Sequence, residues 1–232
     1  EKFFSLSFPT IAGTGSNGAI VHYRANKKTN KLIKTSDLFL VDSGAQYMDG
    51  TTDVTRTICF NTPSKEQIEM YTRVLKGHIA VASSKIKYGE TGKKHDFLAR
   101  QPLQEVNCNF DHGTGHGVGC FLNVHESPPS ISKNSKIKFE DGMIVSNEPG
   151  YYKKNHYGIR IENLILSKLS KGQIYFQTIT IAPFERLLID RAKLTRNEIA
   201  WVNKYHKKVR NTLLPSMNSR EKNWLVNQTA PL

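Results

Sequence analysis

Residues 40–57 read LVDSGAQYMDGTTDVTRT, and this stretch decides the fold. Two apolar runs, predicted as strands over Leu38–Asp42 and Asp53–Phe60, flank a turn at Asp49-Gly50, which is the pattern of a β-hairpin. Each strand carries an aspartate among Val, Leu and Gly rather than among other polar residues. A carboxylate in a buried strand needs a compensating charge, so the hairpin indicates a binding site as well as a fold.

The register of this hairpin sets the distance between its two aspartates. A two-residue turn at Asp49-Gly50 would pair Asp53 with Gln46, four residues from Asp42 and on the order of 13 Å away along the strand. Carboxylates that far apart cannot share a metal ion. We therefore predict a bulge or bend at residues 43–45, where a glycine removes the steric obstacle.

Five candidate metal ligands lie in Gly-rich, strand-like segments of this kind: Asp42, Asp53, His116, Glu148 and Glu162. A single cation such as Arg160 cannot neutralise four buried carboxylates, whereas two divalent metal ions can. Oxygen ligands with one imidazole suit Mn²⁺, and Zn²⁺ or Co²⁺ would also fit. The residues therefore predict a two-metal hydrolase site.

The same motifs carry a family resemblance. LVDSGAQYMDGTTDVTRT, HGTGHGVGCFLNVHE, SNEPGYY and GIRIEN resemble, in order and spacing, the catalytic domain of aminopeptidase P, the Xaa-Pro aminopeptidase group of the pita-bread metallopeptidases, family M24. The similarity runs from about residue 7 to at least the helix carrying Trp201. It implies an α+β pita-bread fold, a curved antiparallel sheet flanked by helices. It also implies that a hydroxide bridging two divalent metals releases the first residue of peptides with proline second.

The resemblance further implies a role for each ligand. Asp42 would hold one ion, His116 and Glu148 the other, and Asp53 and Glu162 would bridge the two. Peptide hydrolysis also needs groups that stabilise an oxyanion and protonate the departing nitrogen. By resemblance, the candidates for this catalytic work are the histidines that flank the metals in the family: His22, His112 and His125.

Arg160 completes the predicted site. It precedes Glu162 by two residues, so on a strand both side chains face the same side. We expect Arg160 to hold a metal-binding carboxylate, with Tyr152 doing similar orienting work.

Other readings of these residues stay open. The acids could accept backbone hydrogen bonds or pair with Arg56 and Arg160 without any metal. A prolidase-type dipeptidase is a close alternative, although the spacing of His116 and His125 matches aminopeptidase P, because prolidase-like chains have fewer residues between these two histidines. A catalytically inactive pita-bread module that binds proteins, in the manner of a histone chaperone, is a third.

Further elements follow from capping and periodicity. A capping box at Ser64 opens a helix that ends before Gly89, and a second helix is predicted over His95–Arg100, interrupted by Pro102. Another capping box at Thr195 opens a helix on which His206 is predicted at the surface. The remaining predicted strands are Gly18–Tyr23, Val118–Val124, Gly142–Asn147, Gly158–Ser167 and Ile174–Ile181.

Composition sets the broader expectations. The 232 residues carry a net charge of +13, but the lysines are scattered, so nucleic acid is an unlikely partner. Three cysteines without CxxC spacing and the lack of a long apolar run predict a cytoplasmic protein without a membrane span. We expect residues 1–232 to form one catalytic domain with a helical C-terminal extension from about residue 190. The chain lacks an initiator Met, so we expect a fragment of a longer multidomain chain, and a homodimer.

Overall fold

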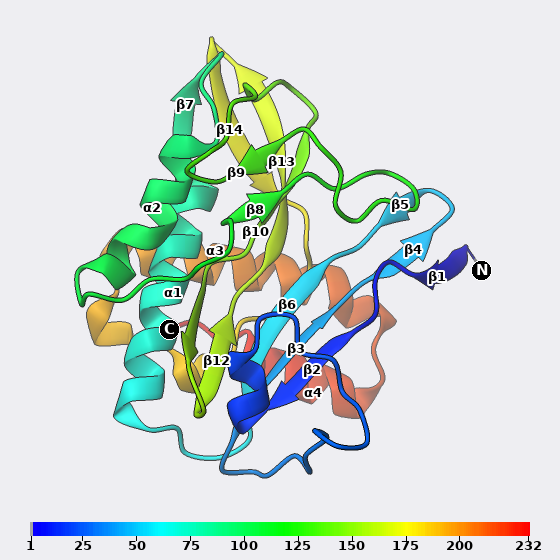
Figure 1. The fold of residues 1–232 in the computed structure, drawn as a ribbon, viewed down its shortest axis with the longest axis vertical. Coiled ribbons are helices and arrows are strands. Elements are labelled where there is room, and N and C mark those ends of the chain that lie inside the picture. The colour runs from blue at the N-terminus through cyan, green and yellow to red at the C-terminus, as the bar shows by residue number, and fades with distance from the viewer. Residues whose placement is uncertain (1) are drawn as a thin grey trace.

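Antiparallel strands form the middle of the molecule, and helices cover them (Figure 1). This computed structural model describes residues 2–232. The strands outside the hairpin are β1 (Phe3–Leu6), β2 (Ile11–Thr14), β7 (Lys85–Lys87), β8 (Gly115–His116), β9 (Ser130–Ile131), β10 (Ile144–Asn147), β11 (Gly150–Lys153), β12 (Tyr157–Arg160), β13 (Asn163–Ser170) and β14 (Gln173–Thr178). Every strand pair in the described residues is antiparallel, which confirms the α+β prediction.

The predicted hairpin is present, but its turn lies one residue earlier than expected. Its strands are β3 (Leu38–Ser43), β4 (Ala45–Tyr47), β5 (Gly50–Thr51) and β6 (Val54–Cys59). Tyr47 pairs with Gly50, so the two-residue turn is Met48-Asp49. The same register continues to Asp42, which pairs with Thr55. The predicted bulge is therefore absent, although the strand assignment breaks at Gly44 and divides the hairpin between two sheets.

This register solves the distance problem without an extra residue. Asp53 lies two residues from Thr55, the partner of Asp42, so both aspartates project from the same face of the hairpin. At the break, a Cβ on Gly44 would lie 2.0 Å from the Thr52 carbonyl oxygen. Only glycine allows this close approach.

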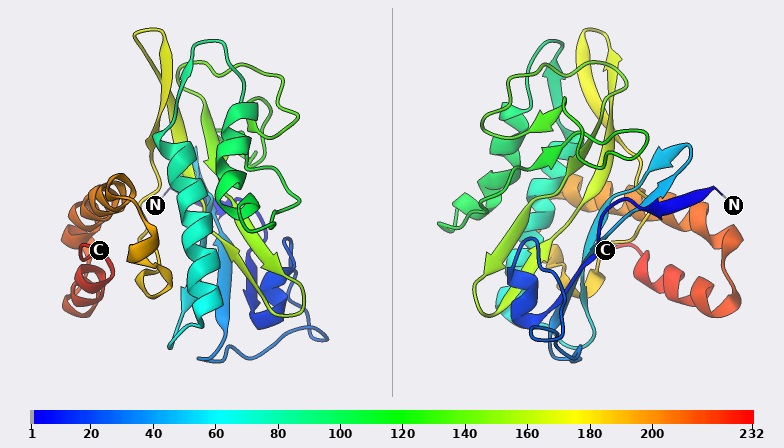
Figure 2. Two further views of the ribbon diagram at one scale, coloured as in Figure 1. Left: turned by 90° about the vertical axis from the view of Figure 1, so that its left-hand side faces the viewer. Right: turned by 45° about the vertical axis from the view of Figure 1, so that its right-hand side comes forward.

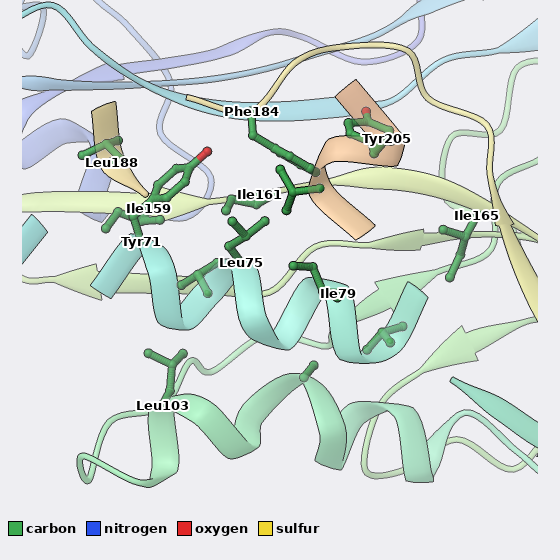
Figure 3. Close-up of a cluster of buried hydrophobic side chains, with 14 of the residues drawn as sticks. Tyr71, Leu75, Ile79, Leu103, Ile159, Ile161, Ile165, Phe184, Leu188 and Tyr205 are labelled. Carbon is green, nitrogen blue, oxygen red and sulfur yellow. The ribbon is translucent and has the colours of Figure 1, made fainter. Parts of the chain in front are cut away.

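Helix α1 (Lys65–Ser83) begins at the predicted capping box, in which Ser64 and Gln67 bond reciprocally. Its apolar stripe contributes Tyr71, Leu75 and Ile79 to the core, where they face the strands and Phe184, while helix α2 packs on the opposite side of α1 (Figure 3). The helix therefore buries the face predicted from its periodicity.

Helix α2 (Lys93–Gln104) is longer than predicted, because it continues through Pro102. Proline removes a helical hydrogen bond, but here it lies in the last turn, its carbonyl accepts a hydrogen bond from Arg73 at 2.7 Å, and Leu103 beside it is fully buried. These tertiary contacts therefore outweigh the tendency of proline to end a helix.

Helices α3 (Arg196–Leu213) and α4 (Ser219–Gln228) lie on the side of the strands away from α2 (Figure 2). The capping box at Thr195 is confirmed. The prediction that His206 lies at the surface is wrong: it is fully buried, and its Nε2 accepts the Phe184 amide at 3.1 Å. His206 lies on the same helical face as Val202 and Val209, so the apolar stripe includes it.

The buried guanidinium of Arg56 joins this C-terminal region to the hairpin. It donates to the Thr55 and Glu162 carbonyls on the strand side, at 2.8 and 2.6 Å. On the other side it donates to the Pro183 and Ala182 carbonyls, at 2.9 and 2.8 Å. Arg56 makes no ion pair with a carboxylate in residues 2–232, so the predicted alternative of Arg56 neutralising the acids is not what the structure shows.

Two predicted strands are absent. Residues 18–23 contain the end of a 3-10 helix, Gly15–Ala19, followed by a turn, because Gly18 and Gly158 approach so closely that a Cβ on Gly158 would lie 1.8 Å from the Gly18 oxygen. Residues 118–124 form a loop after the two-residue strand β8. The predicted strand over 158–167 is two strands, β12 and β13, with a break at 161–162.

No helix in residues 2–232 is both long and apolar enough to cross a membrane.

Candidate metal centre

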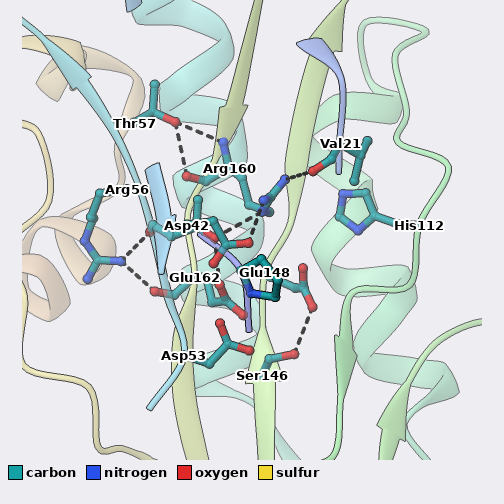
Figure 4. A network of polar contacts seen from close by, with 12 residues as sticks. Val21, Asp42, Asp53, Arg56, Thr57, His112, Ser146, Glu148, Arg160 and Glu162 are labelled. Atoms are coloured by element: carbon teal, nitrogen blue, oxygen red, sulfur yellow. Dashed lines mark hydrogen bonds and ion pairs between the residues drawn. The ribbon is translucent and has the colours of Figure 1, made fainter. Parts of the chain in front are cut away.

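All nine predicted site residues line one cavity of about 410 Å³: His22, Asp42, Asp53, His112, His116, His125, Glu148, Arg160 and Glu162. The close-up in Figure 4 shows the carboxylates turned toward one another, with Arg160 beside them. Residues that are 140 positions apart in the sequence therefore meet in one place.

Each candidate ligand lies at or near the end of a strand. Asp42 is the penultimate residue of β3, Asp53 precedes β6, His116 ends β8, and Glu148 follows β10 by one residue. Glu162 occupies the break between β12 and β13. Strand ends leave the side chain exposed to a cavity while the strand fixes its backbone.

Three of these side chains come close enough to hold one ion. Asp53, His116 and Glu162 each offer a ligand atom, and these atoms lie within 4.8 Å of one another. His116 Nε2 lies 3.5 Å from Asp53 Oδ2 and 3.4 Å from Glu148 Oε1. Glu162 is oriented by the Thr55 hydroxyl, which donates to its Oε2 at 2.7 Å.

Arg160 sits at the centre of a buried hydrogen-bond network. It donates to Asp42 Oδ2 at 2.8 Å, to the Tyr152 hydroxyl at 2.8 Å and to Thr55 Oγ1 at 3.1 Å. Since a guanidinium can only donate, the Tyr152 oxygen accepts from it, and its own proton is directed at His112 Nε2, 2.8 Å away. His112 Nδ1 then donates to the Gly113 carbonyl at 2.8 Å. Both ring nitrogens of His112 are therefore engaged.

His22 and His125 are placed differently from His112. Both are exposed to the cavity, and no hydrogen bond within residues 2–232 restrains either ring. The His125 ring packs against His116, with 3.9 Å between centroids. These two imidazoles are the ones free to contact a substrate.

Burial dominates the electrostatics of the acids. It raises the pKa of Glu148 to about 7, against the opposing effect of His116, and raises the pKa of Glu162 well above its usual range, with Asp53 adding to the effect. Burial also raises the pKa of Asp42, although the Arg160 guanidinium opposes this. Burial lowers the pKa of His116, but the carboxylates of Asp53 and Glu148 outweigh it and the net shift is upward. The cluster therefore attracts cations.

The donor set fits divalent metal ions. Asp42 Oδ1 is buried and has no hydrogen-bond partner in residues 2–232, while Oδ2 is taken by Arg160. A buried carboxylate oxygen without a donor is costly unless a cation binds it. Carboxylates plus one imidazole are also the ligands that Mn²⁺ and related ions accept.

The raised pKa of Glu148 predicts how the metal-free protein responds to pH. Its folded pKa, about 7, lies above the ordinary 4.5, so its contribution to the free energy of unfolding is complete below about pH 4.5 and is lost as the pH rises through about 7. Burial lowers the pKa of His95, His112 and His206 to about 4. These imidazoles therefore reduce the free energy of unfolding only below about pH 6.5, and they do not change how it depends on pH above that value.

We therefore expect the metal-free protein to lose stability between pH 6.5 and 8, by at most about 1.4 kcal/mol per pH unit for each proton released. Urea unfolding after chelation measures the slope. Glu148→Gln should make the slope shallower, although Glu162 and His116, whose pKa values are also raised, still contribute to it. An unchanged slope in that variant would contradict the assignment.

Two supporting residues were not predicted. Thr55 orients Glu162, and Ser146 donates to Glu148 Oε1 at 3.0 Å. Each lies two residues from a predicted ligand, Asp53 or Glu148, on the same strand face, so the period-two rule could have identified them.

Comparison with known proteins agrees with this geometry. The family model described as metallopeptidase family M24 matches residues 1–168, and a model for the C-terminal region of the same peptidase family matches residues 172–232. The chain belongs to metallopeptidase family M24. These matches and the structural similarity described below confirm the pita-bread fold that we expected from the motifs.

Several M24 relatives are similar over the whole chain. Aminopeptidase P1 of Arabidopsis thaliana is 42% identical over 243 residues, covering 100% of this chain and 38% of the relative. Xaa-Pro aminopeptidase 1 of Dictyostelium discoideum is 44% identical over 243 residues, covering 99% and 39%. The chain thus spans about two fifths of the length of the curated relatives that it matches.

Solved structures of this family cover different shares of the chain. The X-prolyl aminopeptidase of Caenorhabditis elegans, described as a cytosolic enzyme with a di-nuclear active site, superposes with a TM-score of 0.95 at 37% identity, covering 100% of this chain and 40% of that one. The prolidase of Pyrococcus furiosus superposes with a TM-score of 0.69 at 32% identity, covering 78% and 51%.

Proposed function

We propose that this chain carries the catalytic site of a metal-dependent Xaa-Pro aminopeptidase, which releases the first residue of peptides with proline second. The observation that carries the proposal is the convergence of five ligand-type side chains, three histidines and Arg160 on one cavity. The whole-chain similarity to X-prolyl aminopeptidase supports the same reading.

Two divalent ions are part of the proposal, held by the five candidate ligands Asp42, Asp53, His116, Glu148 and Glu162. When bound, they would supply a hydrolytic nucleophile at neutral pH and polarise the scissile carbonyl. We propose Mn²⁺ as the ion, because the set has many carboxylates and a single imidazole. Zn²⁺ and Co²⁺ are the alternatives to compare.

The other side chains have distinct tasks in this proposal. Arg160 fixes the Asp42 carboxylate and, through Tyr152, the ring of His112. An Xaa-Pro bond is a tertiary amide whose nitrogen carries no hydrogen, so the departing proline nitrogen must receive a proton. His22 and His125 face the cavity with unrestrained rings, and they are the candidates for contact with the oxyanion and the leaving nitrogen.

Prolidase-type cleavage of dipeptides is less well supported. The curated relatives described above, 42% and 44% identical over nearly the whole chain, are both named as aminopeptidases, and the X-prolyl aminopeptidase structure superposes with the higher TM-score, 0.95 against 0.69 for the prolidase of Pyrococcus furiosus. We also propose, from the similarity to a cytosolic relative, a cytoplasmic location. A homodimer and a single catalytic domain with a helical extension from about residue 190 stay predictions.

Peptide hydrolysis by the full-length protein tests the proposal. An Xaa-Pro-Pro peptide, an Xaa-Ala control and an Xaa-Pro dipeptide are compared after chelation, with and without added Mn²⁺. We expect Mn²⁺-dependent release of the first residue from the Xaa-Pro-Pro peptide alone. Cleavage of the dipeptide alone would indicate a prolidase, and no cleavage by metal-loaded protein would indicate a binding module.

A further inference from the structure

We propose that Gln46 is a positioning residue that holds His125 in the cavity wall by clamping the loop that carries it. The His125 loop is defined here as residues 117–126, between β8 and β9. Gln46 lies in β4, in the hairpin that also carries two candidate metal ligands, and it is 1% exposed. The inference rests on the proposed function and concerns the same site.

The side-chain amide of Gln46 bridges the hairpin turn and the His125 loop. Its Oε1 accepts hydrogen bonds from the Leu122 amide and the Thr51 hydroxyl, both at 2.8 Å. Its Nε2 shares its two hydrogens among three carbonyls, those of Tyr47 (2.9 Å), Gly50 (3.1 Å) and Cys120 (3.3 Å). The amide orientation is determined, because the Leu122 N–H can only donate and must face the oxygen.

The His125 loop needs such an anchor. It contains no helix or strand, and two internal backbone hydrogen bonds hold it, from Gly119 to Asn123 and from Glu126 to Gly117, each 2.8 Å long. At its tip Leu122 has φ +60°, a left-handed conformation that a leucine seldom adopts. The Leu122 side chain is 59% exposed, so burial does not compensate. The hydrogen bond to Gln46 stabilises this backbone conformation instead.

The loop in turn places part of the cavity wall. Val124 and His125 both line the cavity, and the His125 ring packs against His116. No hydrogen bond within residues 2–232 restrains the His125 ring, so its position follows the backbone that Gln46 fixes three residues earlier. The hairpin therefore positions His125 as well as Asp42 and Asp53.

The test compares Gln46→Met with a control, Gln177→Met, at an exposed glutamine of β14, in the full-length Mn²⁺-loaded protein. Methionine keeps the length of the side chain and removes all five hydrogen bonds. On an Xaa-Pro-Pro peptide we expect kcat to fall on the order of 10- to 100-fold in Gln46→Met, with KM changing far less, since a small misplacement of a reacting group acts on the chemical step. Metal content should stay at the wild-type value, and Gln177→Met should behave as wild type.

Two further measurements distinguish an effect of Gln46 on the His125 loop from a loss of overall stability and from a failure of the proposed function. In a His125→Ala background, Gln46→Met should lower kcat by less than about threefold, because its target is already gone. Hydrogen exchange of the 118–125 amides should quicken in Gln46→Met whether or not the peptide is a substrate, so it reports on the clamp alone. A full loss of kcat that persists in His125→Ala, unchanged exchange, or a lowered Tm with normal kcat would each overturn the proposal.

Discussion

Glu148→Gln should abolish peptide hydrolysis while leaving the fold in place, with kcat falling on the order of 1000-fold or more. Glu148 Oε1 faces His116 Nε2 at 3.4 Å and accepts the Ser146 hydroxyl at 3.0 Å. Glutamine keeps the shape but removes the negative charge that a metal ion requires. Because burial already disfavours the charged form of Glu148, the neutral amide should cost little stability.

The matched control for this variant is Glu140→Gln, which removes a carboxylate from an exposed position outside the cavity. Steady-state kinetics on an Xaa-Pro-Pro peptide, metal analysis and thermal unfolding should be compared for both. Glu140→Gln should retain wild-type kcat and metal content. A near-normal kcat in Glu148→Gln would remove Glu148 from the set of ligands.

Arg160→Met should lower both stability and activity. The guanidinium is 1% exposed and pairs with Asp42, so its removal leaves a buried carboxylate without its cation. Breaking a buried ion pair in this way costs about 3–5 kcal/mol, and a bound metal ion would recover part of it. We expect kcat to fall on the order of 100-fold as well, because Asp42 and Tyr152 lose their common donor.

Arg160→Lys distinguishes charge from geometry. A lysine restores the positive charge but cannot reproduce a fork that reaches both Asp42 and Tyr152. We therefore expect most of the free energy of unfolding to return while kcat remains low. Urea unfolding and kinetics on the same preparations check this, and full recovery of kcat in the lysine variant would show that the charge alone is needed.

The five candidate ligands could be selected from the sequence for a physical reason, whereas His22, His112 and His125 followed only from the family resemblance. Each candidate ligand lies in a short segment where a charged or imidazole side chain is surrounded by glycine and apolar residues, and such segments are rare unless the charge has a partner. Thr55 and Ser146 could not be identified in this way, because a hydroxyl on a strand needs no compensating charge. Their role appears only once the Glu162 and Glu148 carboxylates are placed beside them.

The fold was less predictable where long-range contacts decide the local structure. The turn of the hairpin is Met48-Asp49 rather than Asp49-Gly50, because pairing along the whole of β3 and β6 sets the register. Residues 18–23 have strand-like composition but turn, since β12 lies against Gly18. His206 has the polarity of a surface residue, yet it lies on the buried face of α3.

The two family models that match this chain meet at about residue 170, and the position of Arg56 bears on whether the chain also divides there into separate folding units. Its guanidinium joins the carbonyls of Thr55 and Glu162, in the first segment, to those of Ala182 and Pro183, in the second. Separating the two segments would break hydrogen bonds from this buried guanidinium. We therefore expect the two segments to unfold in a single cooperative transition, so that a boundary between family models need not be a boundary between folding units.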